Sequence, residues 1–209
     1  MPARSIASRM AARSAHPWRG QVAALAAAFA LTFAAASVCA QSLQDKIAQC
    51  AACHGEDGKS ADPAIPHIGG QPKLFVMYQL FFYREGRRKS PEMNTIAKEL
   101  TDAELTAISE HVAKLPAPPP QSGTPDEAKF KRGATLARER MCASCHNDDY
   151  SGREQMARLA GQREAYTIQA LKDYRAGVRI GTQAAMPETV RGLSDDDLAA
   201  LAHFLAYVR

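Results

Sequence analysis

The sequence predicts an all-α protein built from two copies of one small helical unit, preceded by an export signal. Three observations support this fold class: apolar residues recur at helical spacing, several landmarks return about 92 residues later, and the first forty residues have the composition of a signal peptide. No run of alternating apolar and polar residues competes as a strand. With 46% hydrophobic and 23% charged residues, the 209-residue chain is also unlike a disordered protein.

Residues 1–40 form the first segment, and we expect them to direct export. They contain four arginines and no acid, then an apolar run over 22–36, then small residues ending at Ala40. This order matches the regions of a secretory signal, and the run is shorter than the ~20 residues that cross a bilayer. The prediction is a periplasmic protein with the signal cleaved after about Ala40. The alternatives are a retained membrane anchor and lipid attachment at Cys39.

The signal also accounts for the net charge and for the odd cysteine. The chain has 26 basic and 22 acidic residues, and removal of the four arginines of the signal leaves 22 of each. A net charge of zero gives no reason to expect nucleic acid as a partner. Of the five cysteines, Cys39 leaves with the signal and four remain.

The rest of the chain divides into two similar halves at a proline-rich stretch, residues 115–125. Prolines lack an N–H donor and favour extended backbone, so such a stretch makes a semi-rigid linker. Four landmarks recur across it at offsets of 91–93 residues: a Cys-x-x-Cys-His motif, a Gly-Gln pair, a Tyr-Arg-x-Gly segment and a methionine. Duplication of one folding unit explains this spacing. We predict domains over 41–118 and 119–209.

Within each half the pattern predicts helices in a fixed order. A short helix begins near Leu43 and runs into the first cysteine. A second helix covers residues 72–86 in one half and 163–177 in the other, and a glycine ends each. The last helix starts at a capping box, in which Ser or Thr is followed three residues later by an acid, and continues with apolar residues at helical spacing. We expect loops around the cysteine and methionine segments.

The Cys-x-x-Cys-His motif carries the chemistry. On a helical turn, its two thiols can bond the two vinyl groups of one haem, and the histidine then lies beneath the iron as its proximal ligand. Two haem c groups are therefore predicted, at Cys50, Cys53 and His54 and at Cys142, Cys145 and His146. A zinc site shared by the four cysteines, or a pair of disulfides, is the alternative, but neither gives the adjacent histidine a role.

A methionine is the expected distal ligand, because thioether sulfur suits haem iron and raises its reduction potential. Met93 and Met186 are the only pair in register, 39 and 40 residues after the two proximal histidines. The other methionines beyond residue 40 suit core packing or lie too close to a cysteine motif: Met77, Met141 and Met156. Histidine ligation is the alternative, through residues that do not repeat between the halves: His67, His111 and His203.

Further residues are expected to support the haem. Pro66 is placed to offer its carbonyl oxygen to the first proximal histidine, whereas Ala157 takes its place in the second half. The second motif is also followed by Asn147 where Gly55 follows the first. Four arginines repeat in register and suit either haem propionates or solvated helix ends: Arg84, Arg88, Arg175 and Arg179.

Beyond residue 40, the whole chain resembles the cytochrome c4 family. The resemblance lies in CAACHGEDG, IPHIGGQ, YREGRR and PEMNTIAKELTDAEL, and then in CASCH, RLAGQ, YRAGVR and AAMPETVRGLSDDDL. It implies two tandem class-I cytochrome c domains, each wrapped around one covalently attached haem c, with His/Met ligation at both irons. It also implies an electron carrier of a respiratory chain. The expected donor is a bc1-type complex or a dehydrogenase, and the expected acceptor is a terminal oxidase or another periplasmic protein.

No catalytic constellation competes with electron transfer. The sequence contains no nucleophile motif, Gly-rich phosphate loop or paired carboxylates, so we predict that the protein is not an enzyme. Association with a membrane is expected only through partners. Two alternatives remain: a dihaem redox enzyme of the peroxidase or sulfur-compound dehydrogenase type, and an electron-transfer subunit of a dehydrogenase complex.

Overall fold

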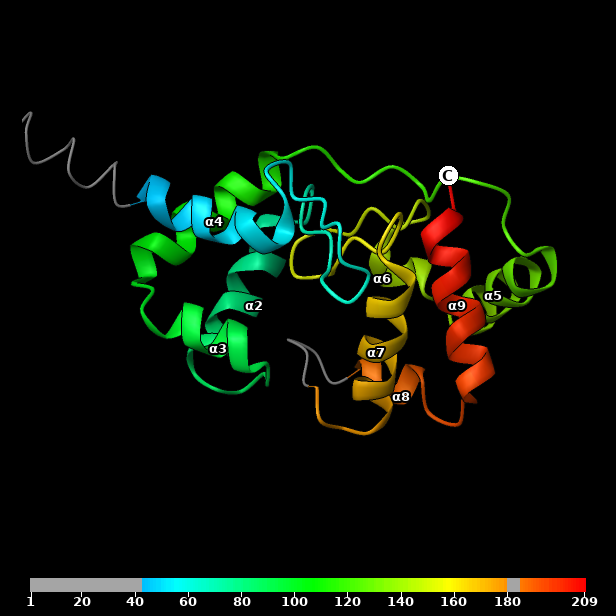
Figure 1. Ribbon diagram of the computed structural model, residues 1–209. Helices are drawn as coiled ribbons and strands as arrows, with labels where there is room; N and C mark the ends of the chain where they lie inside the picture. Colours follow the sequence, from blue (N-terminus) through cyan, green and yellow to red (C-terminus); the bar gives the residue numbers. More distant parts are fainter. Residues whose placement is uncertain (1–42, 180–184) are drawn as a thin grey trace, which may run out of the picture. The chain divides into compact units, whose positions relative to one another are not determined.

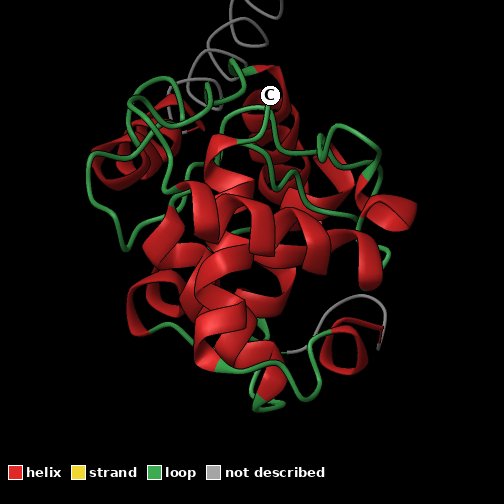
Figure 2. Cartoon of the chain, turned by 90° about the vertical axis from the view of Figure 1, so that its right-hand side faces the viewer, coloured by secondary structure: helices red, strands yellow, loops and turns green. Residues whose placement is uncertain are grey.

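The computed structural model describes residues 43–179 and 185–209, which form helices joined by loops, and this part of the chain contains no β-strand (Figures 1 and 2). The predicted all-α class is therefore confirmed. The signal predicted at 1–40 lies outside the described residues. Among the helices described, none combines the length and the hydropathy needed to cross a bilayer.

The first half contains a helix over residues 43–54, followed by α2 (Lys73–Arg84), α3 (Pro91–Lys98) and α4 (Asp102–Lys114) (Figure 1). The predicted second helix and the capping box of the last helix are confirmed: Thr101 and Glu104 each accept a hydrogen bond from the other's backbone N–H. Helices α2 and α4 pack around apolar side chains that recur at helical spacing, Val76, Leu80, Leu105, Ile108 and Val112.

The second half contains α5 (Glu127–Glu139), α6 (Ala143–His146), α7 (Glu164–Arg175), α8 (Ala185–Thr189) and α9 (Asp195–Tyr207). Its capping box, at Ser194 and Asp197, is also confirmed. Helices α5 and α9 approach closely because Gly133 has no side chain: a Cβ atom there would lie 2.1 Å from the carbonyl oxygen of Ala200. The core of this half contains Leu136, Leu171, Leu198, Leu201 and Phe204.

The expected loops around the two methionines are wrong. Met93 lies in α3 and Met186 lies in α8, so each belongs to a short helix. At α3, the hydroxyl of Ser90 accepts a hydrogen bond from the N–H of Met93, and Pro91 occupies the first helical position. A serine followed by proline is a local helix-start signal, and it outweighs the absence of a long apolar pattern.

The proline-rich linker packs against both halves. A side chain at Gly70 would lie 2.9 Å from Ala117, and one at Gly161 would lie 2.7 Å from the carbonyl oxygen of Pro118. Further along, the N–H of Gln121 donates to the carbonyl of Ala206 at 2.8 Å. The linker is therefore held along its length, and the glycines of the two Gly-Gln pairs make room for it.

Candidate haem-binding sites

Both Cys-x-x-Cys-His motifs lie on helical turns. The first ends the helix over residues 43–54, and the second forms α6 together with its N-terminal residue, Cys142, which has αR backbone angles. The two halves differ just before the motif, because α5 ends at Glu139 and Met141 takes a positive φ of 51°. The turn itself is kept: the N–H of His146 donates to the carbonyl of Cys142 at 3.1 Å.

The two histidines of these motifs have equivalent environments. His54 Nδ1 donates to the Pro66 carbonyl oxygen at 2.9 Å, and His146 Nδ1 donates to the Ala157 carbonyl oxygen at 2.7 Å. Both side chains are buried, and burial lowers the pKa of both imidazoles while the carbonyl bond opposes that shift. A neutral ring whose Nδ1 carries the proton leaves the Nε2 lone pair free to bind a metal.

The predicted contact at Pro66 is therefore confirmed, and loss of the proline in the second half does not remove the equivalent bond. The other departure is also accommodated. Gly55 has a φ of 81°, and Asn147 has a φ of 66° with a ψ of 161°, so both have a positive φ and Asn147 holds a backbone conformation that glycine adopts without strain. The Asn147 amide donates to Ser151 Oγ and to the Gly152 carbonyl, both at 2.9 Å, and stabilises the loop.

The four cysteines of the motifs are free thiols, so the structure gives no support to the disulfide alternative. The zinc alternative is not supported either, because no group of three or more metal-binding side chains occurs in residues 43–179 and 185–209. Cys50 and Cys142 are partly buried, and burial raises the pKa of both thiols. Each pair is thus left available for two thioether bonds.

Each of the two methionines in register contacts the apolar core of its own half. Met93 packs against the first apolar cluster and Met186 against the second, and both side chains are partly buried. Among the histidines weighed as alternative ligands, His203 has both ring nitrogens occupied. Its Nε2 accepts from the N–H of Asp126 and its Nδ1 donates to Glu164, each at 3.0 Å.

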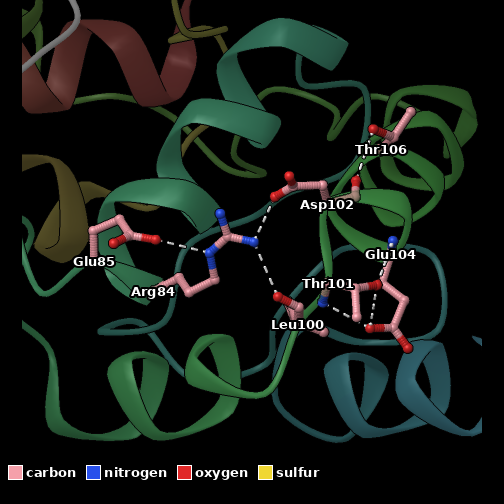
Figure 3. A network of polar contacts seen from close by, with 7 residues as sticks. All are labelled: Arg84, Glu85, Leu100, Thr101, Asp102, Glu104 and Thr106. Atoms are coloured by element: carbon pink, nitrogen blue, oxygen red, sulfur yellow. Dashed lines mark hydrogen bonds and ion pairs between the residues drawn. The ribbon is translucent and has the colours of Figure 1, made fainter.

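The four repeated arginines separate into two kinds. Arg84 donates to the Leu100 carbonyl oxygen at 3.1 Å and to Asp102 at 2.7 Å, which joins the end of α2 to the start of α4 (Figure 3). Arg175 makes the equivalent bonds in the second half, to Leu193 at 2.7 Å and to Asp195 at 2.5 Å. These two arginines support the helix connections.

Arg88 and Arg179 instead converge on one tyrosine. Their guanidinium groups donate to the hydroxyl of Tyr166 at 3.0 and 3.3 Å, and both side chains are buried. Arg88 also lies 4.5 Å from the ring centre of Tyr83, and Arg179 lies 4.7 Å from that of Tyr174. Burial alone would raise the pKa of Tyr166, but the two guanidinium charges outweigh it and lower the pKa to about 7.

Within the described residues, these two buried cations donate side-chain hydrogen bonds only to Tyr166 and, for Arg88, also to Gln79. No carboxylate pairs with either of them in the described part of the chain, and the buried Nε of Arg179 has no hydrogen-bond partner there. Buried charges are normally paired, so the pair fits the carboxylates of haem propionates. Free cysteine pairs, carbonyl-bonded histidines and buried guanidinium groups that make no carboxylate pair in the described structure together form a donor set that fits haem c.

Comparisons with known proteins agree with this geometry. The cytochrome c family model matches residues 41–116 and again 130–209. The chain is 30% identical over 182 residues to cytochrome c4 of Azotobacter vinelandii, which covers 78% of this chain and 85% of that protein. It is 32% identical over 169 residues to a thiosulfate dehydrogenase electron acceptor of Stutzerimonas stutzeri strain A1501, covering 76% and 78%. The crystal structure of reduced recombinant cytochrome c4 from Pseudomonas stutzeri superposes with a TM-score of 0.72 at 29% identity, covering 81% of this chain and 98% of that one.

The predictions of two tandem cytochrome c domains and of two covalent haem c groups are thereby confirmed. The duplicated motifs explain why one family model matches twice along the chain. The chain belongs to the cytochrome c family, as a dihaem electron carrier of the cytochrome c4 type.

Proposed function

We propose that this protein is a periplasmic electron carrier of a respiratory chain and not an enzyme. A signal over residues 1–40 is removed on export, and domains over 41–118 and 119–209 each carry one haem. Electrons come from a bc1-type complex or a dehydrogenase and pass to a terminal oxidase or another periplasmic acceptor. One observation carries the proposal: in each half the histidine of the motif is buried and bonded to a backbone carbonyl, and the methionine in register packs, partly buried, against the apolar core of the same half.

The residues proposed to hold the haems are the same in both halves. Two cysteines form the thioethers, the histidine is the proximal ligand and the methionine is the distal ligand: Cys50, Cys53, His54 and Met93, then Cys142, Cys145, His146 and Met186. Haem c supplies an iron that gains or loses one electron. The carbonyl bonds fix the tautomer and orientation of each imidazole, and the apolar clusters keep water from the site.

Spectroscopy of the purified holoprotein tests this proposal. Two haems per chain are expected, both low-spin, both with the weak methionine–iron charge-transfer band in the ferric state and neither binding cyanide readily. Met93→His and Met186→His should each remove half of that band. A high-spin haem or rapid cyanide binding would instead favour a dihaem peroxidase or sulfur-compound dehydrogenase. The mature protein should be recovered from the periplasm with Gln41 at its N-terminus.

A second candidate function is a dedicated electron acceptor of a dehydrogenase. The similarity to a thiosulfate dehydrogenase electron acceptor favours it, at 32% identity over 169 residues. The two functions differ in whether the protein is free or bound. Native purification separates them: a free monomer supports the mobile carrier, whereas stable co-purification with a dehydrogenase supports the dedicated acceptor.

A further inference from the structure

We infer that Gln71 and Gln162 position and tune the proximal histidine of the half to which they do not belong. Both belong to the repeated Gly-Gln pair, and the residues proposed to hold the haems do not explain why this pair occurs in both halves. The inference rests on the proposed role of His54 and His146 as iron ligands. Through its glutamine, each half would then influence the reduction potential of the haem in the other half.

Each glutamine side chain pairs with the backbone of one residue across the boundary between the halves. Gln162 Nε2 donates to the His67 carbonyl oxygen, and the His67 N–H donates to Gln162 Oε1, both at 2.8 Å. Gln71 makes the same two bonds with Arg158, both at 2.9 Å. We call these the glutamine clamps. Because they hold only backbone atoms, the residue held can be a histidine in one half and an arginine in the other.

The clamps repeat with the symmetry of the duplication. Gln71 and Gln162 are 91 residues apart, and so are His67 and Arg158. One contact is therefore made twice, once in each direction. Both glutamines are buried, at 5% and 7% exposed, so water does not compete for these bonds.

Each clamp acts on the peptide group that also supports a proximal histidine. The N–H of His67 and the carbonyl of Pro66 belong to one planar peptide unit, and that carbonyl accepts from His54 Nδ1 at 2.9 Å. The peptide between Ala157 and Arg158 does the same for His146, at 2.7 Å. The oxygen of each glutamine is thus one peptide unit away from the opposite imidazole.

Hydrogen bonds linked in this way polarise one another. An acceptor on the N–H of a peptide makes its carbonyl a stronger acceptor, by about 10–30% per bond. A stronger carbonyl acceptor makes the imidazole a better electron donor to iron and favours the ferric state, which lowers the reduction potential. Loss of Gln162 should therefore raise the potential of the haem in the first half, and loss of Gln71 should raise that of the second.

The glycine before each glutamine is part of the same device. Gly70 and Gly161 have φ values of 65° and 73°, and the N–H of the following glutamine closes a turn at 3.2 Å onto Ile68 or Leu159. A left-handed residue is needed for this turn, and glycine adopts that conformation without strain. The Gly-Gln pair therefore combines the turn with the clamp.

The test uses Gln71→Met and Gln162→Met in the holoprotein, since methionine keeps the size of the side chain and removes its hydrogen bonds. Potentiometric titration would be followed by NMR, with the two haems assigned through Met93→His and Met186→His. We expect a crossed pattern, in which each variant raises the potential only in the opposite half. The expected change is about three- to tenfold in the ferric–ferrous equilibrium, which is at most about 59 mV for one electron.

Further variants distinguish an effect of the clamp itself from a general loosening of the contact between the halves. Gln162→Glu keeps an acceptor oxygen for His67 and should not raise the potential, so a rise equal to that of Gln162→Met would overturn the inference. Arg163→Lys keeps the charge but loses the guanidinium contact to the Ser60 carbonyl, another bond between the halves, and should leave both potentials unchanged. Equal shifts at both haems, or a shift confined to the variant's own half, would also contradict the clamp.

Hydrogen exchange of the wild-type holoprotein tests the clamp even if a variant fails to fold. The amide protons of His67 and Arg158 and the Nδ1 protons of both proximal histidines should exchange slowly with solvent in both redox states. Fast exchange of these amide protons would overturn the clamp. Absence of two His/Met haems in the wild type contradicts the proposed function, whereas normal spectra with uncrossed shifts contradict only the clamp.

Discussion

Arg84 and Asp102 join the last turn of α2 to the first turn of α4 through a hydrogen bond of 2.7 Å, and the same guanidinium nitrogen also reaches the Leu100 carbonyl oxygen at 3.1 Å (Figure 3). Arg175 and Asp195 repeat the link at 2.5 Å. In contrast, Arg88 and Arg179, which lie four residues after Arg84 and Arg175, are buried and lack a carboxylate partner in the described structure. Position within one repeated motif therefore separates a structural arginine from a candidate propionate donor.

Substitution of the two kinds of arginine should have different effects. Arg84→Lys and Arg175→Lys lose the forked contact and should lower the urea midpoint of their own half, with both haem potentials unchanged. Arg88→Lys and Arg179→Lys should shift the potentials, because each moves a buried charge that we expect to pair with a haem propionate. Urea unfolding and potentiometric titration measure the two effects. A potential shift in Arg84→Lys as large as that in Arg88→Lys would contradict the separation.

The capping box of α4 predicts an acid-sensitive contribution to stability. The pKa of Glu104 is lowered from 4.5 to about 2, chiefly by Lys46 and then by the backbone N–H of Thr101. The unfolded chain therefore binds more protons than the folded one between these pH values, so the contribution is present above pH 4.5 and disappears as the pH falls to about 2. Glu104→Gln should lose about 0.5–1 kcal/mol at neutral pH, because the pair lies near the surface.

The measurement is the free energy of unfolding of wild type and variant from pH 7 to pH 2. The two curves should converge at the acid end. Glu56→Gln is the matched control, since Glu56 is exposed and makes no ion pair within the described residues. A constant difference between wild type and Glu104→Gln over the whole range would contradict the assignment.

At the residue after each proximal histidine, we expect glycine to be accepted in place of Asn147, but asparagine not to be accepted in place of Gly55. Asn147→Gly loses two hydrogen bonds but relieves the strain of an asparagine at φ 66° and ψ 161°, so its net cost should stay below about 1 kcal/mol. Gly55→Asn should cost about 3 kcal/mol, because its Cβ atom would lie 2.4 Å from the Lys59 carbonyl oxygen. Thermal unfolding followed at the haem absorbance band compares the two. Equal losses would show that the loops are equivalent after all.

Two glycines with the same backbone angle test the contact with the linker. Gly161 and Gly192 both have a φ of 73°, but a Cβ atom at Gly192 meets nothing within 4 Å, whereas one at Gly161 lies 2.7 Å from the Pro118 carbonyl oxygen. Each Ala substitution should cost roughly 1–2 kcal/mol for the left-handed conformation. Gly161→Ala should cost about 1–3 kcal/mol more, because the linker must move. Urea unfolding of both variants checks this, and equal costs would mean that the linker yields freely.

Local signals account for most of what the sequence predicted correctly. The capping boxes at Thr101 and Ser194 and the carbonyl of Pro66 involve residues three to twelve positions apart, so spacing alone identifies them. The short helices around the two methionines were missed, although Ser90 and Pro91 form a local start signal. Helix α3 has only eight residues, too few for a repeating apolar pattern, so its capping residues carry the helix signal.

Contacts between the halves could not be predicted from one sequence. The partner of Gln71 lies 87 residues away and that of Gln162 lies 95 residues away, and no local pattern specifies such a pairing. The arginines show the same limit. Arg84 and Arg88 are only four residues apart, yet Arg84 pairs with a carboxylate and Arg88 with Tyr166.

The held linker also changes the thermodynamics of association between the two halves. Because both are part of one chain, their encounter is intramolecular, with an effective concentration on the order of mM for a short connection. A small set of buried hydrogen bonds can then keep the halves together at any dilution of the protein. The contact surface is consequently free to remain polar, and its hydrogen bonds can be used to adjust redox properties.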